Sequence, residues 1–213
     1  MRADAPSELD LASIDTVLST ARSVRRRLDF DRPVEQSTIL DCIDVATQAP
    51  TGLGGESWRF VVVLDSYRKR RLSELYRTVL HELAEERGVV IKPTQQALVA
   101  RLHEIPAMIL VCSTAPAPQG EVAAQVAYYG SILPAAWSLM LALRARQLGA
   151  TWTTLLSSRQ RQVGRILEMP EDAVLTVMLP VAYTKNARLG RARRASARQV
   201  TFWDTWGNAV SPE

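Results

Sequence analysis

Residues that bind metals or cross-link secreted proteins are scarce in this sequence. Among the 213 residues there are two cysteines, Cys42 and Cys112, and two histidines, His81 and His103. Both cysteines lie in apolar stretches, which is typical of buried free thiols and argues against a disulfide framework. Metal-binding spacings such as CxxC and HExxH are also missing. We therefore expect no metal site, and we expect the chain to reside in the reducing cytoplasm.

The sequence also lacks a nucleophile paired with a base. It contains no GxSxG motif, and both histidines lie in charged helical stretches, where we expect them at the surface. No side chain is therefore expected to be catalytic in itself. Any chemistry must come from a bound organic cofactor.

A signal peptide and a membrane span are not expected. The N-terminus has no continuous apolar stretch of the signal-peptide type. Residues 122–143 form a 22-residue stretch without charge, which is long enough to span a membrane. However, this stretch contains Gly130 and Pro134, and Tyr128 and Tyr129 do not lie at its ends as an aromatic belt would. We expect a helix buried in a core or between two subunits.

The overall composition is that of a globular protein. With 47% apolar and 23% charged residues, the chain is expected to form one domain over residues 13–213 after a flexible lead-in at 1–12. The net charge of +4 comes largely from two arginine-rich clusters, at 22–27 and 185–198. Such clusters suit a small anion or a nucleic acid. Because they lack a known nucleic-acid-binding motif, we expect no nucleic-acid partner.

Apolar periodicity, caps and breakers predict a regular order of elements. The predicted helices are 14–21 and 38–49, capped by Ser13 and Ser37, followed by 66–87, 93–104, 122–148 and 158–169. The predicted strands are 59–65, 106–113, 150–156 and 173–183. This order predicts an α+β sandwich with a small, mostly antiparallel central sheet covered by helices. In the tail, 185–213, apolar Phe202, Trp203 and Trp206 follow a polar stretch, which favours packing on a partner subunit.

Two candidate sites lie in the first quarter of the chain. Arg22, Ser23 and Arg25 could grip a phosphate through guanidinium forks and a hydroxyl, although a solvated basic patch would look the same. The segment APTGLGG at 49–55 could bring backbone amides close to a flat ligand, or it could be a tight structural turn. It is not a GxGxxG motif after a strand, so a Rossmann site is excluded.

Two more candidates lie further along the chain. The segment LGATWTTLLS at 148–157 joins a helix to a predicted strand, at the kind of strand end where ligands collect, although a core strand would have the same sequence. A late arginine cluster contains Arg191, Arg193 and Arg194.

In their order and spacing, the four candidates resemble the nitroreductase family of FMN-dependent oxidoreductases. ARSVR at 21–25 is similar to the family's RxSxR, APTGLGGESW at 49–58 to its APSxxNxQPW loop, and the LG at 148–149 to its turn after the central helix. Arg194 with Arg193 is similar to its late arginine. The resemblance covers 14 to about 206, and RSVRRRLDFDRPV is similar to an actinobacterial branch.

The resemblance implies a site for FMN at the interface of a homodimer whose tails wrap the partner subunit. It implies that the phosphate is bound by Arg22, Ser23, Arg25, Arg193 and Arg194. It implies that the flavin ring is lined by Pro50, Thr51, Gly52, Leu53 and Gly54, and contacted by the backbone of Thr154, Leu155 and Leu156.

The chain departs from the family pattern at both early motifs. Ala21 replaces the leading arginine of RxSxR, and Gly54 and Glu56 stand where the family has asparagine and glutamine. FMN binding is expected to survive these changes because the other arginines and the backbone remain. The range of acceptors is expected to change.

The implied activity is hydride transfer from NAD(P)H to an electron-poor small-molecule acceptor, a nitroaromatic or a quinone, by a ping-pong mechanism. Residues that select the acceptor are expected within 66–105 and near Tyr128 and Tyr129. Two alternatives stay open. One is an FMN-dependent dehydrogenase or oxidase that forms a double bond in a small-molecule or peptide substrate, and the other is a relative that binds a deazaflavin.

Overall fold

The computed structural model describes residues 9–52 and 55–209. Two compact units share these residues. One unit is residues 21–187, and the other combines the N-terminal helix with the chain from Arg188 onward.

The larger unit is built on a five-stranded sheet in which every pair of strands is antiparallel. Its strands are β1 (Leu28–Asp29), β2 (Trp58–Val63), β3 (Ala107–Ser113), β4 (Leu148–Ala150) and β5 (Val174–Thr184). The order is β1-β5-β3-β2, and β4 also pairs with β5. The predicted small antiparallel sheet is therefore confirmed.

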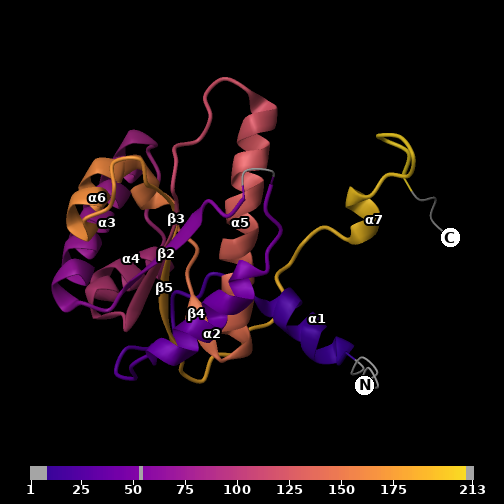
Figure 1. Ribbon diagram of the computed structural model, residues 1–213. Coiled ribbons are helices and arrows are strands. Elements are labelled where there is room, and N and C mark those ends of the chain that lie inside the picture. The colour runs from indigo at the N-terminus through magenta and orange to yellow at the C-terminus, as the bar shows by residue number, and fades with distance from the viewer. Residues whose placement is uncertain (1–8, 53–54, 210–213) are drawn as a thin grey trace, which may run out of the picture. The chain divides into compact units, whose positions relative to one another are not determined.

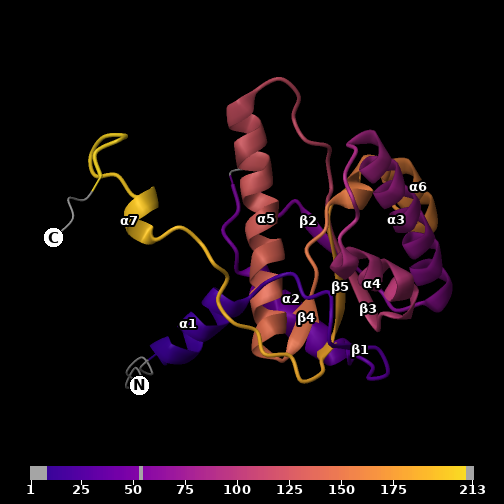
Figure 2. The same cartoon turned by 180° about the vertical axis from the view of Figure 1, so that it is seen from behind.

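Helices cover both faces of this sheet, which explains why all seven residues of β3 are buried (Figures 1 and 2). On one face lie α2 (Gln36–Thr47) and α5 (Val122–Ala145). On the other lie α3 (Ser66–Glu86), α4 (Pro93–Arg101), η1 (Leu102–Glu104), η2 (Leu155–Arg159) and α6 (Gln160–Leu167). The predicted α+β sandwich is confirmed.

One predicted strand is wrong. Residues 150–156 were expected to be extended, but β4 ends at Ala150 and residues 155–159 form a 3₁₀ turn. Thr153 makes an isolated bridge to Met178, and its hydroxyl accepts a hydrogen bond from the N–H of Leu155 at 3.3 Å. This local side-chain bond competes with a strand ladder, which is how a β-branched sequence comes to turn here.

Two predicted helix starts are also wrong by a few residues. The N-cap of α2 is Glu35 and not Ser37. In the smaller unit, α1 (Leu11–Thr20) starts before Ser13, whose N–H and hydroxyl both donate to the carboxylate of Asp10, at 3.2 and 2.6 Å. The aspartate therefore takes the capping role that the sequence suggested for the serine.

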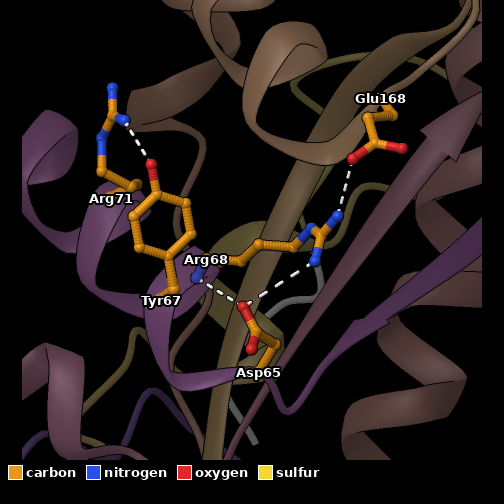
Figure 3. A network of polar contacts seen from close by, with 5 residues as sticks. All are labelled: Asp65, Tyr67, Arg68, Arg71 and Glu168. Carbon is orange, nitrogen blue, oxygen red and sulfur yellow. Dashed lines mark hydrogen bonds and ion pairs between the residues drawn. The ribbon is translucent and has the colours of Figure 1, made fainter.

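A polar network holds α3 against the end of α6 (Figure 3). Asp65 caps α3 by accepting a hydrogen bond from the N–H of Arg68 at 2.8 Å. The guanidinium of Arg68 reaches Glu168, directly after α6, at 2.7 Å. Glu168 has a left-handed backbone with φ 55°. Beside it, Arg71 donates to the hydroxyl of Tyr67 at 3.0 Å.

The long helix α5, which contains the uncharged stretch 122–143, is buried along one face in the single chain. By length and composition alone it could cross a membrane, but a core helix passes the same test. Ile132, Ala136, Leu139 and Leu143 are fully buried in the core between α5 and the sheet. The other face carries Val122, Val126, Tyr129 and Trp137, which are exposed in the single chain.

In the smaller unit, the chain after α7 (Ala197–Val200) forms a compact turn. Phe202 bridges to Ala209, the N–H of Trp203 donates to the carbonyl oxygen of Asn208 at 2.8 Å, and the rings of Phe202 and Trp206 lie 5.2 Å apart. Trp206 is 92% exposed.

Candidate functional site

An open groove of about 910 Å³ runs along the outer face of α5 in the larger unit. Its lining residues come from α5 and from two other segments, at Ser23 and at Trp152. They are Ser23, Val122, Gln125, Val126, Tyr129, Gly130, Leu133, Pro134, Trp137, Met140 and Trp152. None of them is charged, and Tyr129 has the only ionisable side chain in this set. The lining therefore suits a flat, apolar body.

The first and third candidate segments lie side by side at one wall of this groove. Ser23 forms a parallel bridge with Ala150, and the N–H of Val24 donates to the carbonyl oxygen of Ala150 at 2.9 Å. The hydroxyl of Thr151 donates to the carbonyl oxygen of Val24 at 2.7 Å, and the N–H of Trp152 donates to Ser23 Oγ at 3.0 Å. Hydrogen bonds between residues 127 and 129 positions apart thereby join the two segments at Val24 and Ser23.

The turn after α5 has the sequence LG because a side chain at its second position, Gly149, would have no room. A Cβ atom at this position would lie 3.0 Å from side-chain atoms of Leu28 and Thr184 and 3.1 Å from Val24. Only glycine lets the segment at 24–28 pack this closely on β4. The glycine therefore fixes the position of Ser23 relative to the groove.

Arg22 and Arg25 flank Ser23 and are half-buried. Of this motif, Ser23 lines the groove, whereas Arg22 and Arg25 are not among the lining residues. Guanidinium groups and a hydroxyl are the kinds of donor that a phosphate requires.

The second candidate, the glycine-rich loop, is attached to α5. The N–H of Gly52 donates to Ser131 Oγ at 2.8 Å. Gly130 and Leu133, on either side of Ser131, line the groove. Pro50 and Thr51 are exposed, whereas Leu53 and Gly54 lie outside the described residues.

Comparison with known proteins agrees with this geometry. A sequence model described as the Nitroreductase family matches residues 18–183. The chain belongs to the nitroreductase family.

Three relatives of the nitroreductase fold illustrate the similarity. Iodotyrosine deiodinase from Thermotoga neapolitana is 29% identical over 183 residues, which are 80% of this chain and 89% of the relative. A crystal structure of oxidised iodotyrosine deiodinase bound to FMN and 3-iodo-L-tyrosine has a TM-score of 0.69 and 23% identity, covering 90% of this chain and 98% of that one. A nitroreductase-like family protein from Bacillus cereus has a TM-score of 0.68 and 20% identity, covering 93% and 100%.

Several residues assigned from the nitroreductase resemblance are not among the residues that line the groove. Thr154, Leu155 and Leu156 do not line it, and η2, which contains both leucines, contacts α3 on the opposite face of the sheet. Arg193 and Arg194 are exposed in the smaller unit. The roles of these five residues stay predictions.

The two regions expected to select the acceptor lie in different places relative to the groove. Within 66–105, α3 and α4 lie on the face of the sheet opposite the groove (Figure 2). Tyr129 lines the groove, and Tyr128 packs edge-on against it with ring centroids 5.0 Å apart. The hydroxyl of Tyr128 donates to the carbonyl oxygen of Ala115 at 2.8 Å, and burial raises its pKa. Tyr128 therefore fixes the loop before α5 as a neutral phenol.

Sequence reasoning missed two residues of this site, Ser131 and Trp137, and identified Trp152 only as part of the candidate segment at 148–157. The signal was available for Trp137, because Val122, Val126, Tyr129, Leu133 and Trp137 recur at helical spacing along one face. The surrounding residues are almost all apolar, so the composition alone does not separate this face from the buried one.

Proposed function

We propose that the groove along α5 binds FMN and that the protein is a flavin-dependent oxidoreductase. One observation carries the proposal: Ser23, flanked by two arginines, is hydrogen-bonded to the Trp152 backbone at the wall of an apolar groove. Ser23 Oγ accepts from Trp152, so its own proton is available to a phosphate oxygen. The apolar lining suits the flavin ring system. The FMN in the deiodinase structure of similar fold supports the same conclusion.

The protein's own part is to bind, orient and exclude water. FMN, when bound, would supply the redox chemistry of hydride transfer. Arg22 and Arg25 would hold its anionic end, and the apolar groove would orient the flat ring and exclude water. Since Tyr129 has the only ionisable side chain in the lining, the chain contributes orientation here and no acid–base pair.

We propose NAD(P)H as the electron donor and a nitroaromatic or quinone as the acceptor. The uncharged, aromatic-rich lining favours planar acceptors of low polarity. The test is anaerobic mixing of the FMN-loaded protein with NADH or NADPH, followed by addition of a nitroaromatic or a quinone. Loss of the flavin absorbance and its return on adding acceptor are expected. Flavin that stays oxidised would contradict the proposal and favour the dehydrogenase or oxidase alternative.

The relationship to iodotyrosine deiodinase favours reductive dehalogenation as a second candidate, because that relative aligns over 80% of the chain. In this reaction an aryl carbon–iodine bond is replaced by carbon–hydrogen, consuming two electrons and a proton and releasing iodide. The test is iodide release from 3-iodotyrosine by the FMN-loaded protein with dithionite as reductant. Iodide at the rate of spontaneous release would eliminate this candidate.

We further propose a cytoplasmic homodimer with residues 13–213 as its folded domain and the tail packed on the partner. The exposed face of α5 and the exposed aromatic rings of the tail support this proposal. Buried free cysteines fit a reducing compartment.

A further inference from the structure

Ser131 is a buried polar residue on a helix that is otherwise apolar at this depth. It is 7% exposed, and its hydroxyl donates to the carbonyl oxygen of Ala127 one turn earlier, at 2.9 Å. That bond uses the only proton of the hydroxyl, so Oγ faces the loop solely as an acceptor. Its partner there is the N–H of Gly52, at 2.8 Å.

Gly52 has no side chain to obstruct this contact. A Cβ at this position would lie 3.1 Å from Ser131 Oγ and 3.9 Å from the carbonyl oxygen of Ala127. The backbone of Gly52 is not in the left-handed region, so glycine is needed here for space and not for conformation. A side chain at Gly52 would therefore require Ser131 or the loop to shift slightly where the loop meets α5.

The contact lies at the edge of the groove. Gly130 precedes Ser131 in the sequence and lines the groove, as do Leu133 and Pro134 after it. Ala49, just before the loop, packs with Trp58 and with Ala135 of α5 in a small buried cluster. The loop is thus fixed at Ala49 by packing and at Gly52 by one hydrogen bond.

We propose that Ser131 is a positioning residue, which holds the loop at 50–52 against α5 so that its backbone borders the flavin ring. This inference rests on the proposed FMN site. Without the Ser131 hydroxyl, the loop loses its hydrogen bond to α5 and moves more freely, so binding must order it again. The consequence is weaker FMN binding with little effect on the fold, because Gly52 is itself exposed.

The test compares Ser131→Ala with Ser138→Ala, a half-buried serine two turns along the same helix that does not line the groove. FMN is titrated into each apoprotein by flavin fluorescence, and the thermal midpoint of each apoprotein is recorded. Loss of one hydrogen bond predicts an about five- to tenfold increase in the FMN Kd for Ser131→Ala, with Ser138→Ala unchanged. A change below twofold for Ser131→Ala would overturn the inference.

A double-mutant cycle keeps the test valid if Ser131→Ala folds poorly. Gly52→Ala places a methyl group on an exposed loop and is expected to raise the FMN Kd in the wild-type background. It should add little in the Ser131→Ala background, where the oxygen it would approach is gone. Additive effects would refute the contact. If wild type and Ser138→Ala both fail to bind FMN, the proposed function fails and the inference fails with it.

An NMR measurement needs no flavin. The Gly52 amide of the apoprotein is expected to exchange with solvent more slowly in wild type and in Ser138→Ala than in Ser131→Ala. Equal exchange in all three proteins would show that the bond does not hold the loop.

Discussion

Ser23 serves both the fold and the proposed ligand. Its Oγ accepts the N–H of Trp152, which ties the first motif to the wall of the groove, and its proton is left for a phosphate. We expect Ser23→Ala to raise the FMN Kd by about tenfold to a hundredfold, since a hydrogen bond to a charged group is lost. Fluorescence titration measures this change, with Ser138→Ala as the control. Unchanged affinity in Ser23→Ala would contradict the assignment.

Cys112 is expected to make stability depend on pH in the alkaline range. Burial raises the pKa of its thiol from 9.0 to about 12. The unfolded chain releases this proton near pH 9 and the folded chain holds it, so the associated stability is present below pH 9 and is lost as pH rises towards 12. The loss approaches about 1.4 kcal/mol per pH unit.

Urea unfolding at pH 8 and pH 10 tests this expectation. Wild type should lose about 1.4 kcal/mol more than Cys112→Ala between the two values, whatever the cost of the substitution itself. Equal losses in the two proteins would mean that the thiol is accessible to solvent in the folded state.

Single residues differed in how far the sequence could predict them. Arg22, Ser23 and Gly52 were identified because charge and glycine stand out in a motif. The structure places Ser23 in the lining of the groove and joins Gly52 to Ser131 of α5. Ser131 could not be found in this way, because its importance depends on a partner 79 positions away in the sequence.

Among the elements, hydrophobic periodicity predicted whether a segment is a helix or a strand better than it predicted where that element begins and ends. The β3 and β5 strands and the long helices α3 and α5 lie where their apolar patterns indicated. The segment after β4 is not the strand that its β-branched residues indicated. It makes an isolated bridge to β5 at Thr153, and the hydrogen bond to the Thr153 hydroxyl outweighs the β-branched propensity. The two-residue β1 was missed, since it is too short for any period.

Glu168, at the end of α6, has an unfavourable left-handed backbone conformation and forms one weak ion pair. Glu168 has φ 55° and pairs with Arg68, but both side chains are well exposed to solvent. Glu168→Gln and Glu168→Gly both remove the ion pair, and only glycine also relieves the left-handed strain. We expect Glu168→Gly to be more stable than Glu168→Gln by about 1 kcal/mol, measured by urea unfolding. The reverse order would show that the backbone conformation carries no cost.

At the scale of the whole molecule, both units expose large aromatic side chains. Tyr129 and Trp137 on α5 are 42% and 40% exposed, and in the smaller unit Trp203 and Trp206 are 58% and 92% exposed. The first two residues lie on one face of α5, and the other two lie close together in the sequence. Surfaces of this kind are typical of interfaces between subunits.

Sedimentation at micromolar concentration is therefore expected to give a dimer. Trp137→Glu on α5 should shift the protein towards monomer, because a charge would be buried in the contact. Leu40→Lys, at an apolar position of α2 that is 59% exposed, is the matched control and should leave the dimer intact. A monomeric wild type, or equal effects of the two substitutions, would contradict the proposed interface.

The visible spectrum of the purified protein, with the released cofactor quantified, tests the central claim most directly. We predict a flavin spectrum, with FMN released on heat denaturation at about one per chain, and recovery of that stoichiometry when the apoprotein is mixed with FMN. A colourless protein that takes up no FMN, or a bound chromophore with the spectrum of a deazaflavin, would contradict the assignment of the groove to FMN.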